Sequence, residues 1–113
     1  MDAQRCILTR RSVRQFADRP VSRELLEKVV SLASYAPSWK NTQISRYIAI
    51  EDPATRETIA SEYCLPGANN PTIIRACPLL VAQTFVKARS GYERDGSFTT
   101  DREAGWQYYD CGI

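Results

Sequence analysis

Two polar stretches, one helix apart, decide how the chain is interpreted: Arg10–Phe16, RRSVRQF, and Ala36–Gln43, APSWKNTQ. The first places three guanidinium groups and a hydroxyl within five residues, beside an aromatic ring. Such donors suit a phosphate group and the electron-rich edge of a flat heterocycle. The second is a turn rich in amide and hydroxyl groups, which can meet the polar edge of a ring. Together the stretches predict a site for a planar, phosphorylated ligand.

The segment between the two stretches is predicted to be an amphipathic helix. Ser22 suits an N-cap, and Glu24 lies where the helix dipole favours negative charge. Apolar residues recur at helical spacing over Leu25–Ala33, so this face is expected to lie in the core. Pro37 ends the helix, because the residue before a proline avoids helical dihedral angles.

The rest of the pattern alternates strands with short helices. Arg46–Ile50 is expected to be a strand, and Pro78–Phe85 a central, mostly buried strand. Asp52 and Pro53 suit the cap and first position of another helix. The remaining expectations are a helix over 2–9, the end of the Pro53 helix near 63, a loop over 65–71, a helix over 72–76, a polar loop over 90–102 and a helix starting at 106.

The composition excludes several classes of protein. At 113 residues, with 43% apolar and 25% charged residues, the chain is one globular domain at most. It has no histidine, which removes Ser-His-Asp and Cys-His catalysis. Its four cysteines lack the close pairing of a zinc site, so no metal is expected. Neither a signal peptide nor a membrane span is visible, and the expected location is the cytoplasm, with free thiols.

The last helix suggests that the native protein is longer. A helix that starts at Trp106 has only its first turns before Ile113, and such a helix would be marginal alone. The chain is therefore expected to be a single truncated domain, residues 1–113, with a frayed natural terminus as the alternative.

The order of these features resembles the nitroreductase family over essentially the whole chain. The arginine stretch follows a short helix, and the Ala36–Gln43 turn follows an amphipathic one. An Asp-Pro helix, an Asn-containing loop and Ile74–Pro78, IRACP, then lead into an apolar strand. Trp106 and Asp110–Ile113 are similar to the opening of the long central helix of the family. The resemblance implies an α+β, three-layer fold with a mixed central sheet flanked by helices, of which the C-terminal part is missing.

The resemblance also implies a cofactor and a set of binding residues. The family consists of FMN-dependent homodimers that take hydride from NADH or NADPH and reduce nitroaromatics, quinones and similar acceptors in a ping-pong cycle. Arg10 and Ser12, with Arg11 in the same cluster, would hold the phosphate and ribityl chain of FMN, and Arg14 would approach the N1/O2 edge. Further FMN contacts implied by the family are Pro37, Ser38 and Asn41 from the other protomer, and Asn69 at the pyrimidine ring, with Asn70 as the substitute.

The chemistry agrees with those roles. Reduced flavin tends to lose the N1 proton, so a fixed cation at that edge favours the reduced form. Transfer of hydride from nicotinamide to flavin requires stacking and not an acid or base, so the lack of histidine is no obstacle. The implied enzyme is the longer parent protein, because the Gly-rich loop, the late basic residues and the tail of the family are absent from this chain.

Three other interpretations remain open from the sequence. One is a flavin-binding relative with different chemistry, such as reductive dehalogenation or flavin fragmentation. Another is an inactive fragment. The third is a small module whose arginines bind a polyanion, although the net charge of +2 is nearly balanced and no nucleic-acid partner is expected. For the arginine stretch alone, a solvated basic surface is the ordinary explanation.

Overall fold

The computed structural model describes residues 2–113 and confirms an α+β class. Contacts divide the chain into two compact units. Unit 1 comprises the residues up to Arg19 and Glu51–Pro78, and unit 2 comprises Pro20–Ile50 and Leu79–Ile113. Of the expected mixed central sheet, the described residues form two antiparallel strands. No helix in this part of the chain combines the length and apolar character needed to cross a bilayer.

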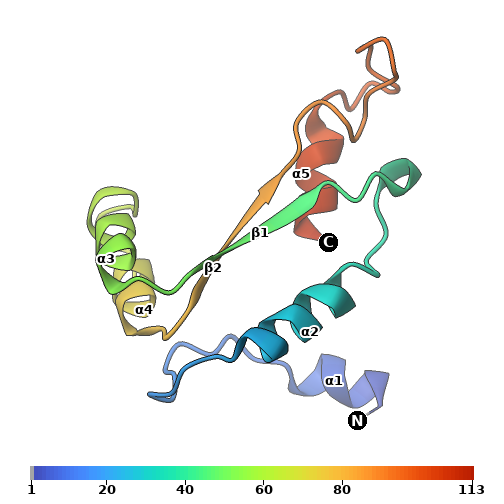
Figure 1. Cartoon of the computed structure of the whole chain (residues 1–113). Helices are drawn as coiled ribbons and strands as arrows, with labels where there is room; N and C mark the ends of the chain where they lie inside the picture. Colours follow the sequence, from blue (N-terminus) through green and yellow to red (C-terminus); the bar gives the residue numbers. More distant parts are fainter. Residues whose placement is uncertain (1) are drawn as a thin grey trace. The chain divides into compact units, whose positions relative to one another are not determined.

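Unit 1 contains three helices, two of which begin at a side-chain cap. Helix α1 spans Ala3–Thr9, and the Asp2 carboxylate accepts a 2.7 Å hydrogen bond from the Arg5 N–H. Helix α3 spans Pro53–Glu62, with Asp52 as its cap as predicted. Helix α4, Asn70–Ala76, packs on α3 (Figure 1).

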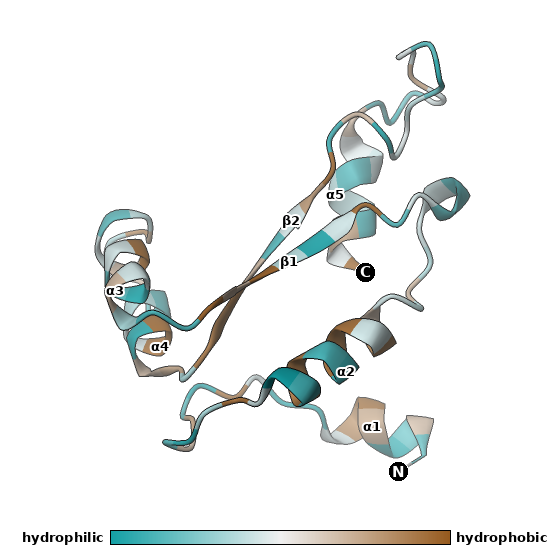
Figure 2. Ribbon diagram, viewed as in Figure 1, coloured by the Kyte–Doolittle hydropathy of each residue, from teal (hydrophilic) through white to brown (hydrophobic). Residues whose placement is uncertain are grey.

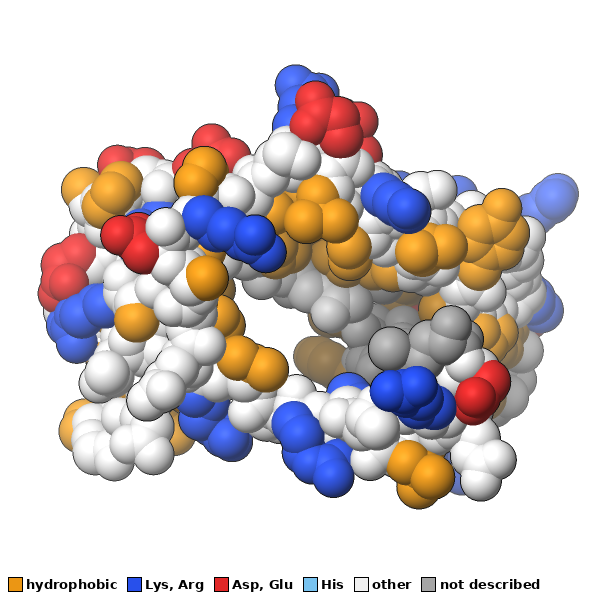
Figure 3. All heavy atoms as spheres, turned by 90° about the horizontal axis from the view of Figure 1, so that it is seen from below, with side chains coloured by type: hydrophobic (Ala, Val, Ile, Leu, Met, Phe, Trp, Pro, Cys, Tyr) orange, Lys and Arg blue, Asp and Glu red, His pale blue; other side chains and the backbone are white. Residues whose placement is uncertain are grey.

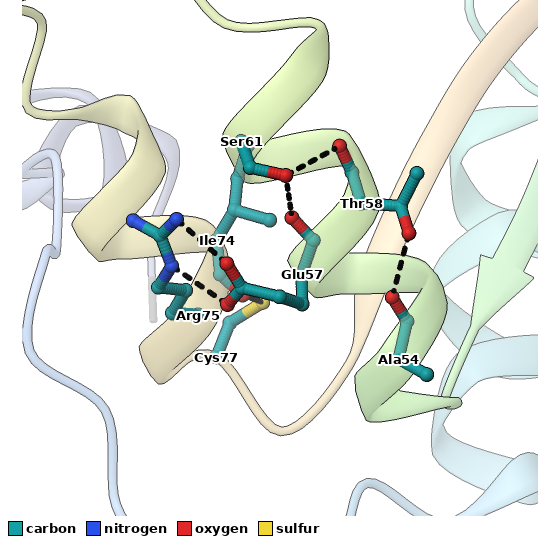
Figure 4. Close-up of polar contacts among 7 residues, drawn as sticks. All are labelled: Ala54, Glu57, Thr58, Ser61, Ile74, Arg75 and Cys77. Carbon is teal, nitrogen blue, oxygen red and sulfur yellow. Dashed lines mark hydrogen bonds and ion pairs between the residues drawn. The ribbon is translucent and has the colours of Figure 1, made fainter.

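Helices α3 and α4 pack together and share an ion pair at the surface. Ala60 and Cys77 are buried, and the Cys77 Sγ–H donates to the Ile74 carbonyl oxygen at 3.2 Å. The Arg75 guanidinium donates two 2.8 Å hydrogen bonds to the Glu57 carboxylate on α3 (Figure 4). These bonds hold the pKa of Glu57 below its usual range, because they stabilise the ionised form.

The predicted start of α4 is wrong by two residues. The sequence predicts a helix from Thr72, whereas the helix begins at Asn70 with Asn69 as its cap. The reason is Pro71, which lies in the first turn, where its missing N–H costs no helical hydrogen bond. Asn69 and Asn70 therefore stand at a helix start and not inside a loop.

Unit 2 is built on two paired strands and the helix that packs against one of them. Strands β1, Ser45–Ile50, and β2, Leu80–Phe85, pair with Ser45 opposite Phe85 and Ile50 opposite Leu80. Helix α5, Gly105–Gly112, packs on β2 through an edge-to-face contact of Tyr108 with Phe85, 5.4 Å between ring centroids. The other elements are α2, Arg23–Ala33, and the short helix η1, Trp39–Asn41.

Two predictions about burial are wrong for this chain. Strand β2 begins at Leu80, two residues later than predicted. It is not central, because it has a single partner strand among the described residues, and it is not mostly buried, since Val81 is exposed. The apolar stripe of α2 is not buried either: more than half of the Leu25, Val29 and Leu32 surface is accessible, and the other three members of the stripe are half-buried (Leu26, Val30 and Ala33). Figure 2 shows hydrophobic and hydrophilic residues alternating along α2, and Figure 3 shows hydrophobic side chains at the surface among charged ones. Patterning thus sets which face is apolar, but burial needs a covering element.

The Ser22 cap gives a direct test of local stability. The Ser22 hydroxyl accepts a 3.2 Å hydrogen bond from the Leu25 N–H. We expect Ser22→Ala to lower the free energy of unfolding by about 1 kcal/mol and Ser22→Gly by only a few tenths. Urea denaturation followed by circular dichroism measures both. Ser31→Ala is the control, since its exposed hydroxyl caps nothing; a Ser31 variant as unstable as Ser22→Ala would contradict the capping role.

Candidate functional site

The arginine stretch follows α1 as an exposed, extended segment of unit 1. Arg10 is the C-cap of α1, and its N–H donates to the Cys6 carbonyl oxygen at 3.1 Å. Arg11 folds back on the same helix end, where its Nη1 donates to the carbonyl oxygens of Leu8 and Arg10 at 2.9 and 2.8 Å. The Arg14 Nη1 donates to the Ser12 carbonyl oxygen at 3.4 Å. Neutral carbonyl oxygens are therefore the acceptors for Arg11 and Arg14.

No carboxylate neutralises these guanidinium groups within residues 2–113. The ion pairs of the described chain form elsewhere, between Arg23 and Glu27, Lys40 and Glu93, and Arg75 and Glu57. A guanidinium group carries five N–H donors, so each arginine keeps donors for an anion. The stretch thus carries three exposed positive charges without a carboxylate partner among the described residues, a donor set that suits a phosphate group.

The second stretch forms a tight turn in unit 2. The Ser38 hydroxyl accepts a 2.9 Å hydrogen bond from the Gln43 N–H, and the Ser38 carbonyl accepts one of 2.9 Å from the Asn41 N–H. Lys40, Asn41 and Gln43 have left-handed φ values of 46°, 53° and 47°. Non-glycine residues rarely adopt this conformation, so the surrounding contacts must hold it.

A buried carboxylate on α5 supplies one of those contacts. Asp110 Oδ2 accepts a 2.9 Å hydrogen bond from the Trp39 N–H and a 2.5 Å bond from the Ser90 hydroxyl. Asp110 is 7% exposed, and Ser90 is fully buried. Sequence reasoning placed Asp110 only at the opening of a helix and Ser90 only in a polar loop. Gln107 and Asp110, three residues apart among aromatic residues, were the available signal, because this spacing puts two polar groups on one helix face.

An exposed ion pair connects the same turn to the loop after β2. Lys40 Nζ lies 2.8 Å from Glu93 Oε1 and 4.2 Å from the centre of the Trp39 ring. Glu93 also accepts a 2.9 Å hydrogen bond from the Thr99 hydroxyl. The bonds from Lys40 and then Thr99 hold the pKa of Glu93 below its usual range. The turn is therefore held at Trp39 by the hydrogen bond to Asp110 and at Lys40 by the exposed ion pair with Glu93.

The predicted cofactor residues fall into two sets. Arg10, Arg11, Ser12, Arg14 and Asn69 belong to unit 1, where the first four form one exposed segment and Asn69 caps α4 without a side-chain bond to the helix. The second set belongs to unit 2 and lies in the single turn described above: Pro37, Ser38 and Asn41. Exposed side chains dominate both sets, with Ser38 half-buried.

A separate hollow of about 500 Å³ lies beside the start of α5 in unit 2. Arg102, Gly105, Trp106 and Tyr109 line it, and the Trp106 and Tyr109 rings meet edge to face at 5.8 Å. The Trp106 Nε1–H donates to the Thr100 hydroxyl at 2.8 Å, which fixes the indole. None of the residues predicted to bind the cofactor lines this hollow.

Acid should weaken the ion pair between Lys40 and Glu93. Because the pKa of Glu93 is lowered in the folded state, its contribution to stability is present above the usual glutamate pKa of 4.5 and disappears as the pH falls through the lower folded value. We expect Glu93→Gln to lower Tm at pH 7 by at most about 5 °C. The Tm difference from wild type should shrink below pH 4.5. Scanning calorimetry measures it, with Glu103→Gln as the control; a difference constant with pH would refute the assignment.

The comparisons with known proteins agree on one family. The family described as "Nitroreductase family" matches residues 7–72, more than half of the chain, and that range includes both polar stretches. A protein of Thermus thermophilus named "NADH dehydrogenase" is 37% identical over 59 residues, which cover 52% of this chain and 29% of that protein. The chain spans less than half the length of the curated relatives that it matches.

Solved structures support the same fold. A nitroreductase family protein from Clostridium novyi NT superposes with a TM-score of 0.77 at 21% identity, covering all of this chain and 59% of that one. An FMN-dependent nitroreductase from Clostridium difficile is 27% identical, with a TM-score of 0.55 and coverage of 66% of this chain and 42% of that one. Given the family match across both polar stretches and the shared fold, the chain belongs to the nitroreductase family.

Proposed function

We propose that the chain is the cofactor-binding part of an FMN-dependent oxidoreductase that uses NADH or NADPH to reduce nitroaromatics, quinones or similar small acceptors in a ping-pong cycle. One observation carries the proposal: the Arg10–Arg14 segment exposes three guanidinium groups without a carboxylate partner among the described residues, inside the range matched to the family. The Clostridium difficile neighbour is named FMN-dependent, and the Thermus relative is named an NADH dehydrogenase, which supports the choice of cofactor and reductant.

The donors present fit FMN. Its phosphate carries negative charge, and Arg10, Arg11 and Ser12 offer guanidinium and hydroxyl groups to it. Arg14 would place a fixed positive charge at the N1/O2 edge, where negative charge grows on reduction. The Asn69 side chain, which makes no cap bond, would donate to the pyrimidine ring.

When bound, FMN supplies the redox chemistry, accepting two electrons from the nicotinamide and passing them to the acceptor. The residues of this chain bind, orient and tune the flavin, and none needs to act as an acid or base. The turn at Pro37, Ser38 and Asn41 would complete the site from the second protomer of a homodimer. In this proposal residues 1–113 form one FMN-binding domain.

The first experiment is a titration of the purified chain with FMN, followed by flavin fluorescence. In the whole oxidoreductase of this proposal, NADH or NADPH should bleach the yellow colour of the FMN complex under anaerobic conditions, and a quinone should restore it. A chain that stays colourless and leaves the fluorescence of added FMN unchanged would contradict the proposal. Binding to DNA that falls steeply with salt, without flavin binding, would favour the polyanion module instead.

Arg14→Ala tests the assigned contact at the flavin edge. Loss of one charge-assisted hydrogen bond, worth about 1.5–3 kcal/mol, should raise the Kd for FMN by about tenfold to a hundredfold and, in the whole oxidoreductase, lower turnover. Arg19→Ala, which removes another exposed arginine of unit 1, should leave both unchanged. Equal affinities of wild type and Arg14→Ala would show that the role of Arg14 is wrong.

A further inference from the structure

The Asp110 carboxylate joins two segments that are far from it in sequence. Trp39 lies 71 positions away, in the turn after α2, and Ser90 lies 20 positions away, in the loop after β2. Both donate to the same oxygen, Oδ2. A carboxylate that is shielded from water is costly unless hydrogen bonds compensate it, so the fold keeps this one only with both donors in place.

Close contacts next to Asp110 also join α5 to the loop after β2. One helical turn earlier, Gln107 is also buried, and its Oε1 accepts a 2.6 Å hydrogen bond from the Ala88 N–H. Gly91 approaches the start of α5 so closely that an added Cβ would lie 2.9 Å from the Trp106 Cβ. Polar side chains of α5 therefore accept hydrogen bonds from the loop after β2, and Asp110 also accepts one from the turn at Trp39.

We infer that Asp110 is a positioning residue for the Pro37–Gln43 turn. Its bond to the Trp39 N–H fixes the first residue of η1, directly before the left-handed residues Lys40 and Asn41. Because those conformations are unfavourable alone, the turn keeps its shape only while it is anchored. Asp110 thereby sets where the Ser38 and Asn41 side chains point. That these side chains meet FMN rests on the proposed function.

Two variants of Asp110 differ in whether they keep the hydrogen bonds to Trp39 and Ser90. In Asp110→Asn, the amide oxygen in the place of Oδ2 can still accept from both the Trp39 N–H and the Ser90 hydroxyl, so both contacts survive without the negative charge. In Asp110→Ala, both are lost. Asp101→Ala is the matched control, because it makes the same substitution at an exposed aspartate of unit 2.

Two measurements on the 113-residue chain test the inference. NMR hydrogen exchange without flavin should show the Trp39, Asn41 and Gln43 amides exchanging at least about tenfold faster in Asp110→Ala, with the β1–β2 amides unchanged. The Kd for FMN should rise at least about tenfold in the same variant. Asp110→Asn should stay within about threefold of wild type in both, and Asp101→Ala should match wild type.

The outcomes distinguish this inference from the proposed function. Unchanged turn exchange in Asp110→Ala, or Asp110→Asn as disruptive as Asp110→Ala, overturns the positioning role. If wild type binds no FMN but the turn exchanges faster only in Asp110→Ala, the positioning role stands and the proposed function fails. If Asp110→Ala does not fold, Asp110→Leu decides: its side chain fills a similar space without an acceptor for the Trp39 N–H, and unchanged exchange at the Trp39, Asn41 and Gln43 amides would overturn the inference.

Discussion

The hydrogen bond from the Trp39 N–H to the buried Asp110 carboxylate is the interaction on which the shape of the Pro37–Gln43 turn in unit 2 depends. It holds a turn with three left-handed, non-glycine residues, a conformation that local preferences oppose. It also ties that turn to α5, the helix that packs on β2. The polar groups of the turn are thus presented by a helix outside their own segment, which is how folded proteins give loops defined shapes.

The arginine stretch of unit 1 is organised differently. Its guanidinium groups lie on the surface, and Arg11 and Arg14 donate to carbonyl oxygens close to them in sequence. Such contacts orient the side chains without neutralising them. An anion that arrives there competes with water and not with a carboxylate, which is the electrostatic basis of the proposal that this segment binds the phosphate of a cofactor.

Much of the local structure could be predicted from the sequence. Ser22 and Asp52 mark helix starts because a side-chain oxygen satisfies backbone N–H groups that the first turn leaves free, whatever lies nearby. The errors concern the start of α4 and, above all, burial. The apolar positions of α2 repeat at helical spacing, yet Leu25, Val29 and Leu32 are exposed. The sequence of β2 predicts a buried strand, yet β2 has one partner strand among the described residues. Periodicity reports which face is apolar, whereas burial depends on what covers that face.

By itself the sequence determined the caps of α2 and α3 and the two donor-rich stretches, because each of these follows from neighbouring residues and their chemistry, whereas the α+β class was an expectation from the family resemblance. Only the tertiary structure decided that Asp110, Ser90 and Gln107 fix the backbone of the turn and of the loop after β2. Those bonds join residues between 19 and 71 positions apart. No local pattern specifies such a pairing, since it exists only once helix, loop and turn have been brought together by folding.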